Sequence, residues 1–298
     1  MGSTILVLIL GSVIMKRVVS KDGTEISYSV SGRSSDNIKP ALILVHGAGG
    51  SGTRWASVLP LFNQPFEVYA LHRRGRNRDF KARNYSIEIE YQDIAALVDH
   101  LHHSGVQTIY LLGHSFGGIC CLEASLLTAH IDKLILYEPP VCGLGVQVYP
   151  VGFLDKIDAF MKAGDREAII SSFLVDIVRL SPLELELFQS TDQWSEELKT
   201  AHTLPRELRA AVRYEFDERR FSSMKTQTLL LCGSDSLPFF KVAANMIEGG
   251  LSCSYQQVLS GQQHVAMDTA PELFTRIVID FLCQSDEYYS PYHAGMSL

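Results

Sequence analysis

The sequence of 298 residues lacks the usual signals of a metal-binding, nucleic-acid-binding or membrane-spanning protein. Its six cysteines form no CxxC pair, and no group of cysteines and histidines has the spacing of a zinc site. Acidic residues outnumber lysine and arginine by 33 to 26, so the formal net charge of −7 gives nucleic acid no electrostatic attraction. We therefore expect no metal site and no nucleic-acid partner.

The N-terminus also lacks the basic residues that precede the apolar segment of a secretory signal. Its apolar run over residues 5–14 is too short to span a bilayer. Residues 1–14 are interpreted as an apolar extension, with an atypical leader or a docked strand as alternatives. We expect a cytoplasmic protein without a stable membrane span, whose cysteines are reduced and mostly buried. The cysteines are Cys120, Cys121, Cys142, Cys232, Cys253 and Cys283.

Strand-length apolar runs alternate with helix-length stretches, in a chain that is 46% apolar and 20% charged. The central runs are almost continuously apolar, as strands buried on both faces must be. This alternation predicts the α/β class, with a mostly parallel central sheet flanked by helices. A hairpin is predicted first, because residues 18–19 and 26–30 flank Asp22–Gly23. Further strands are predicted at 41–45, 67–71, 108–112, 133–137, 228–232 and 254–259, and helices at 53–63, 86–104, 115–128, 237–248 and 271–283.

Residues 139–226 interrupt this rhythm, because they show helical patterns and no convincing strand. Gly164 suits the end of a helix, and Pro182 and Pro205 suit first turns. We predict a helical cap here, inserted between the sixth and seventh strands. The α/β core would then comprise residues 15–138 and 227–284, with a tail over 285–298. The oligomeric state leaves no sign in the sequence.

The sequence Gly-His-Ser-Phe-Gly at 113–117 is the strongest signal of chemistry. This GxSxG motif follows an apolar run directly and leads into a helix of small residues, the strand–elbow–helix context that a nucleophilic serine requires. Gly113 and Gly117 leave room for a tight turn, and Ser115 is expected in a strained backbone conformation that exposes its hydroxyl. An ordinary glycine-rich turn is the alternative interpretation.

With this motif the chain resembles the α/β-hydrolase superfamily, over residues 15 to about 283. His-Gly-Ala-Gly-Gly at 46–50 matches the family's oxyanion loop. The resemblance implies that the N–H groups of Ala48 and Phe116 stabilise an oxyanion. Gly-Gln-Gln-His at 261–264 follows the last strand, and His264 is similar to the family's late catalytic histidine.

The segment Leu-His-Arg-Arg-Gly-Arg at 71–76 is a third match, but it departs from the Asp-Arg-Arg-Gly-Arg-Gly often found in related hydrolases. His72 replaces the acid and Asn77 replaces the final glycine, which leaves the local loop geometry open. The arginines are interpreted as structural groups that bind carbonyls and carboxylates of loops.

Two carboxylates compete for the third position of a catalytic triad, which must orient the histidine and stabilise its charged form. Asp235 follows the seventh strand, the commonest location in the family, but comes one residue before the usual register. Glu138 follows the sixth strand, where some lactonases and dehalogenases of the superfamily carry their acid. A glutamate at a buried strand end also requires a partner. We favour Glu138 and keep Asp235 as the alternative.

These residues predict a serine hydrolase that cleaves a small ester, lactone or thioester through an acyl-enzyme on Ser115. The resemblance implies a small-molecule substrate and neither a metal nor an organic cofactor. A hydroxynitrile lyase or a carbon–carbon bond hydrolase could use the same groups. A ligand-sensing receptor could retain them with little turnover, because a fold does not determine a function.

Overall fold

The computed structural model describes residues 14–33, 38–76, 85–141 and 149–283. Within them, eight strands form one sheet in the order β1-β2-β4-β3-β5-β6-β7-β8. β2 pairs antiparallel with β1 and β4, and the other neighbours pair parallel. The mostly parallel sheet predicted from the sequence is therefore confirmed. The strands are β1 (Ile14–Val19), β2 (Glu25–Ser31), β3 (Ala41–Val45), β4 (Glu67–His72), β5 (Ile109–His114), β6 (Lys133–Tyr137), β7 (Gln227–Gly233) and β8 (Ser254–Leu259).

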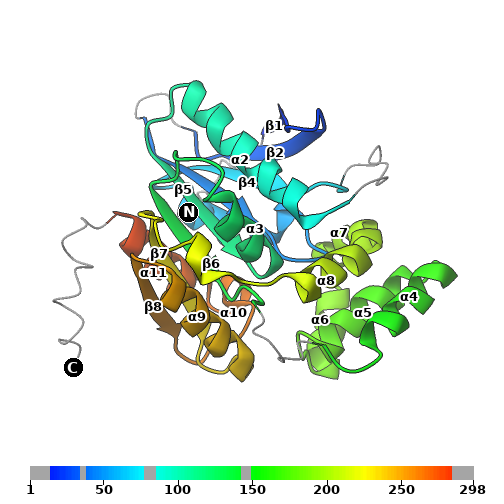
Figure 1. The fold of residues 1–298 in the computed structure, drawn as a ribbon. Coiled ribbons are helices and arrows are strands. Elements are labelled where there is room, and N and C mark those ends of the chain that lie inside the picture. Colours follow the sequence, from blue (N-terminus) through cyan, green and yellow to red (C-terminus); the bar gives the residue numbers. More distant parts are fainter. Residues whose placement is uncertain (1–13, 34–37, 77–84, 142–148, 284–298) are drawn as a thin grey trace, which may run out of the picture.

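Helices cover both faces of this sheet, because both faces are apolar (Figure 1). Side chains alternate along a strand, so Ile43 and Val45 of β3 join the core formed with α2 and α3. Leu42 and Leu44 join the core formed with α11 on the opposite face. The core helices are α1 (Leu59–Phe62), α2 (Ile87–His103), α3 (Phe116–Ala124), α9 (Pro238–Gly250), α10 (Ala266–Thr269) and α11 (Pro271–Cys283), with short 3-10 helices η1 (Gly52–Trp55) and η3 (Glu218–Arg220).

Two of the predicted helices need correction. The single helix expected over 53–63 is two short pieces, η1 and α1, because Pro60 suits a first turn but cannot continue a helix that began earlier. The helix expected over 115–128 begins at Phe116 and ends at Ala124. Ser125 is its C-cap, and the Ser125 hydroxyl bonds to the Leu122 carbonyl 2.6 Å away.

An inserted helical segment connects β6 to β7, as predicted, and Figure 1 shows its helices gathered to one side of the sheet. Gly164 ends the first of these helices with a φ of 72°, and Pro182 and Pro205 lie in first turns. The sequence prediction missed α7, because Trp194 and Leu198 are its only large apolar residues and its start depends on a cap by Thr191. The segment comprises α4 (Phe153–Ala163), α5 (Arg166–Asp176), α6 (Pro182–Gln189), α7 (Asp192–Thr200), η2 (Ala201–Thr203) and α8 (Leu204–Arg213).

Several predictions concern residues outside the described parts: most of the extension 1–14, Asn77, Cys142 and the tail 285–298. The division into a core and a cap at residues 139 and 226 stays a prediction. Of the helices that the structure describes, none has both the length and the apolar character needed to cross a membrane.

Candidate active site

Ser115 occupies a sharp turn between the end of β5 and the start of α3. Its φ of 53° and ψ of −126° lie in a region that residues other than glycine rarely adopt, as predicted for a strained elbow. A Cβ atom on Gly117 would lie 2.4 Å from the His46 carbonyl oxygen, and one on Gly113 would lie 2.6 Å from the Gly117 oxygen. Glycine at position 117 therefore lets the serine turn pack against the loop after β3, and glycine at position 113 lets the end of β5 pack against the start of α3.

His264 lies in the loop between β8 and α10, and three groups set the position of its ring. Its Nδ1 atom is 2.6 Å from Oε2 of Glu138. The Phe240 ring stacks on the imidazole with a centroid distance of 4.6 Å and an interplanar angle of 14°. The His114 ring also lies 4.6 Å from it, tilted by 44°. Because Nδ1 is bound to Glu138, Nε2 is the nitrogen left to face a nucleophile.

Glu138 follows β6 with a φ of 48°, and its side chain is completely buried. Its Oε1 accepts a hydrogen bond of 2.7 Å from the N–H of Gly233, at the end of β7. Burial alone would raise the pKa of Glu138, but the hydrogen bond and charge of His264 lower it below the usual value of 4.5. Glu138 is therefore a buried carboxylate whose two oxygens are both bound.

Asp235 occupies a different environment. Its residue is exposed, and its Oδ1 accepts a hydrogen bond of 2.7 Å from the neighbouring Ser234 hydroxyl. In the described parts of the chain, no hydrogen bond joins Asp235 to His264. Of the two carboxylates that the sequence left open, the geometry thus brings Glu138 to the histidine.

Ala48 and Phe116 line the same cavity as Ser115 and His264. Ala48 belongs to the loop after β3, and Phe116 is the first residue of α3. No acceptor for either backbone N–H is found among the described residues. Both donors that the family resemblance implied are therefore available at the serine.

Tyr137 and His114 also hold the histidine loop, and the role of Tyr137 was not predicted from the sequence. The Tyr137 hydroxyl donates to the carbonyl of Gln263 and accepts a hydrogen bond of 3.0 Å from the N–H of Ala266. His114 Nε2 lies 2.9 Å from the carbonyl oxygen of His264. Burial lowers the pKa of His114 well below its usual range, so the ring is neutral and Nε2–H can donate. No pattern in the sequence marks these contacts, although both residues neighbour predicted site residues.

Replacing Tyr137 with phenylalanine is expected to lower the free energy of unfolding by about 1–3 kcal/mol, since two backbone groups lose their partner. We also expect a fall in kcat of roughly tenfold, because the His264 loop is no longer held in register. Denaturant titration and ester kinetics measure the two effects. Tyr28→Phe, at a buried tyrosine of β2, is the control and should keep full kcat. An unchanged kcat in Tyr137→Phe would show that the hydroxyl only stabilises the fold.

Two cavities share Ser115, His264 and Ala48 as lining residues. The first has a volume of about 250 Å³ and is mainly apolar. The second, of about 210 Å³, is also mainly apolar, and its lining includes the basic side chain of Arg54 and the acidic side chains of Glu184, Glu197 and Asp268. In the described parts of the chain, no three histidine, cysteine or acidic side chains are grouped so that they could hold a metal ion. The apolar lining of the first cavity includes Tyr149, Phe173, Ile177, Leu237, Phe239 and Phe240.

Comparisons with known proteins agree with this fold. The sequence profile of the Alpha/beta hydrolase family matches residues 42–277, so the chain belongs to that family. Over 252 residues it is 24% identical to RutD of Escherichia coli O81 (strain ED1a), which is named as a candidate carbamate hydrolase. That match covers 82% of this chain and 91% of RutD.

Solved structures show the same fold. An alpha/beta hydrolase from Sphaerobacter thermophilus DSM 20745 is 26% identical, with a TM-score of 0.73 over 89% of this chain and 99% of its own. An enol-lactonase from Burkholderia xenovorans LB400 is 18% identical, with a TM-score of 0.72 over 90% of this chain and 100% of its own. An esterase, RhEst1 from Rhodococcus sp. ECU1013, is 22% identical, with a TM-score of 0.72 over 91% of this chain and 98% of its own.

Proposed function

We propose that this protein is a serine hydrolase that cleaves a small ester, lactone or thioester through an acyl-enzyme on Ser115. The observation that carries the proposal is the 2.6 Å contact between His264 Nδ1 and the buried Glu138 carboxylate, in a cavity that also contains Ser115. A serine, a histidine and a buried carboxylate in this relation are the groups that acyl transfer needs. In this proposal Glu138 is the acid of the triad, and Asp235 is not.

The reaction begins with attack by the Ser115 oxygen on the substrate carbonyl, while His264 Nε2 removes the hydroxyl proton. Glu138 keeps the proton of the imidazole on Nδ1 and stabilises the imidazolium that forms. His264 then gives its proton to the leaving alcohol or thiol, and the carbon–oxygen or carbon–sulfur bond breaks. Water, deprotonated by His264, attacks the acyl-enzyme and releases the carboxylic acid and the free serine.

The negative charge on the carbonyl oxygen develops opposite two backbone N–H groups, those of Ala48 and Phe116. Each such donor contributes about 3–4 kcal/mol to transition-state stabilisation in comparable sites. The N-terminus of α3 adds a favourable dipole at the same point. These groups favour acyl transfer over a reaction that forms no oxyanion.

The cavities support a mainly apolar substrate that also has a polar part. Both cavities are mainly apolar and suit a short aliphatic or aromatic group, and Arg54, Glu197 and Asp268 in the second can contact a polar group of the substrate. Similar proteins named as an esterase, an enol-lactonase and a candidate carbamate hydrolase all point to carbonyl substrates. We therefore place the reaction among ester-type hydrolyses.

A fluorophosphonate probe tests this proposal directly. We expect a single covalent adduct, located on Ser115 by peptide mass spectrometry, together with hydrolysis of short p-nitrophenyl esters. Heat-denatured protein is the control and should not be labelled. Absence of both the adduct and turnover would reject the proposal. Melting shifts with esters or lactones in the absence of turnover would favour a receptor instead.

A further inference from the structure

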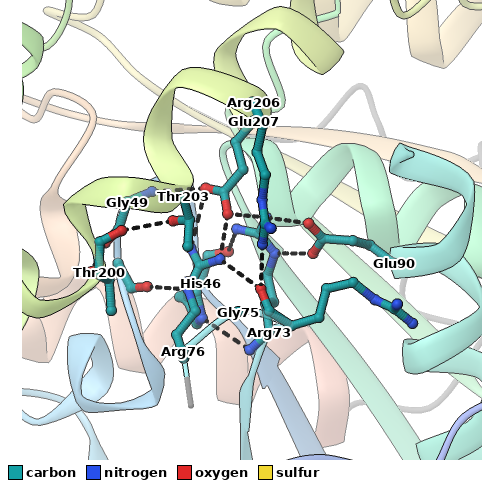
Figure 2. A network of polar contacts seen from close by, with 12 residues as sticks. His46, Gly49, Arg73, Gly75, Arg76, Glu90, Thr200, Thr203, Arg206 and Glu207 are labelled. Atoms are coloured by element: carbon teal, nitrogen blue, oxygen red, sulfur yellow. Dashed lines mark hydrogen bonds and ion pairs between the residues drawn. The ribbon is translucent and has the colours of Figure 1, made fainter. Parts of the chain in front are cut away.

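A buried ionic network joins the loop at residues 46–50 to helix α8 of the inserted segment (Figure 2). At its centre is Glu207, whose side chain is completely buried. This carboxylate accepts a hydrogen bond of 2.9 Å from the Gly49 N–H, bonds to Arg76, and lies 3.2 Å from Nη2 of Arg73. Burial would raise the pKa of Glu207, but Arg73 and Arg76 hold it at about 2, so the group is charged at neutral pH.

Side chains of this network bind backbone groups of successive peptides in the loop at 46–50. Arg73 Nη1 donates to the Gly47 carbonyl oxygen at 2.8 Å, and Arg76 Nε donates to the Gly50 carbonyl oxygen at 2.8 Å. Gly49 is held on both sides, because its N–H donates to Glu207 and its carbonyl accepts from the Thr200 hydroxyl. The peptides on both sides of Ala48 are thus anchored by side chains from elsewhere in the chain.

The contact between Arg73 and Gly47 has a direct geometric consequence for Ala48. In a trans peptide the C=O of one residue and the N–H of the next point in opposite directions, and none of the described peptide bonds is cis. Holding the Gly47 C=O against Arg73 therefore directs the Ala48 N–H away from Arg73. The same guanidinium lies 4.5 Å above the centre of the Phe116 ring, so it contacts Phe116 as well as the peptide that carries the Ala48 N–H.

Arg73 is itself rigidly held. Its Nε and Nη2 atoms bind the two oxygens of Glu90 at 2.6 and 2.9 Å, and Tyr85 donates to Glu90 at 2.7 Å. Such a two-point contact leaves the guanidinium one orientation, which a lysine could not reproduce. Buried ion pairs rarely add net stability, because removing their charges from water costs free energy. An apolar contact between the inserted segment and the core would carry a lower desolvation cost than this ionic network.

We propose that Arg73 and Thr200 are positioning residues for the oxyanion hole: Arg73 sets the direction of the Ala48 N–H, and Thr200, supplied with Glu207 by the inserted segment, fixes the carbonyl of Gly49, the residue after Ala48. This inference rests on the proposed function, because it concerns how the same site stabilises charge. Docking of the inserted segment is then coupled to assembly of the oxyanion hole, and not only to enclosure of the cavity.

The test compares Arg73→Lys, Thr200→Val and Thr200→Ser with the wild type. The readouts are kcat and KM for a p-nitrophenyl ester, Ki for an aryl trifluoromethyl ketone that forms a tetrahedral oxyanion on serine, and melting temperature. We expect kcat to fall roughly 100-fold in Arg73→Lys and roughly tenfold in Thr200→Val, because small misplacements of a catalytic group have effects of this size. The Ki for the ketone should rise by the same factor, with KM nearly unchanged. Thr200→Ser, which keeps the hydroxyl, should have the kcat and the Ki of the wild type.

Arg74→Lys is the matched control. Arg74 is a neighbouring buried arginine whose guanidinium makes a two-point contact with Asp93 and also binds Asp22 and the Ile89 carbonyl. This variant should lower the melting temperature but keep wild-type kcat and Ki. Variants of Arg73 and Thr200 that melt at a lower temperature yet keep wild-type kcat and Ki would overturn this inference but leave the proposed function standing. A wild type that neither turns over esters nor reacts with the fluorophosphonate would reject the proposed function, and the inference with it.

Discussion

Ser115→Ala is expected to lower kcat for a p-nitrophenyl ester by roughly 10⁴- to 10⁶-fold, because losing the nucleophile disables the triad as a unit. The remaining rate would come from binding and from the N–H groups of Ala48 and Phe116. The variant should also lose its fluorophosphonate adduct. Stopped-flow or steady-state kinetics with intact-mass analysis measure both results.

The backbone at Ser115 provides an internal check on this variant. Alanine at a φ of 53° is as strained as serine, whereas glycine adopts this conformation at little cost. Ser115→Gly should therefore be equally inactive but melt at a higher temperature than Ser115→Ala. Ser125→Ala, at the end of the same helix, should keep wild-type activity. Ester hydrolysis by Ser115→Ala at more than a tenth of the wild-type rate would rule out an acyl-enzyme on this residue.

Glu138→Gln is expected to lower kcat by about 10⁴-fold while the protein stays folded, because an amide no longer stabilises the imidazolium and can stabilise the wrong tautomer of His264. The Gly233 N–H can still donate to the amide oxygen, which limits the structural damage. Asp235→Asn, at the exposed alternative carboxylate, should keep kcat within about tenfold of the wild type. The opposite ranking of the two variants would transfer the role of the acid to Asp235.

The pH dependence of stability is a second test of the contact between Glu138 and His264. The pKa of Glu138 is lower in the folded protein than its usual value of 4.5, so the folded state favours the charged form. Its contribution to stability is fully present above pH 4.5 and disappears as pH falls through the lower, folded pKa. The difference in unfolding free energy between wild type and Glu138→Gln should therefore shrink in that acidic range. A difference that does not change with pH would contradict the ionised contact with His264.

Much of the fold followed from the sequence because its signals are local. Apolar runs such as 41–45 and 133–137 predict strands buried on both faces, and the glycines around Ser115 predict a tight elbow. The polar helix α7 was missed, because it depends on a cap and on packing against the rest of the segment. The single helix expected over 53–63 was wrong, because Pro60 starts a separate turn.

By itself, the sequence determined the sheet, the serine elbow and the order of the candidate residues, since neighbours along the chain set these features. Only the tertiary structure decided which carboxylate meets His264. β6 and β7 end side by side at the same edge of the sheet, so both Glu138 and Asp235 arrive near the histidine loop. The Glu138 side chain is buried against Nδ1 of His264, whereas Asp235 is exposed. The contacts of Thr200 and Glu207 with the loop at 46–50 likewise join segments more than a hundred residues apart, and only packing could bring them together.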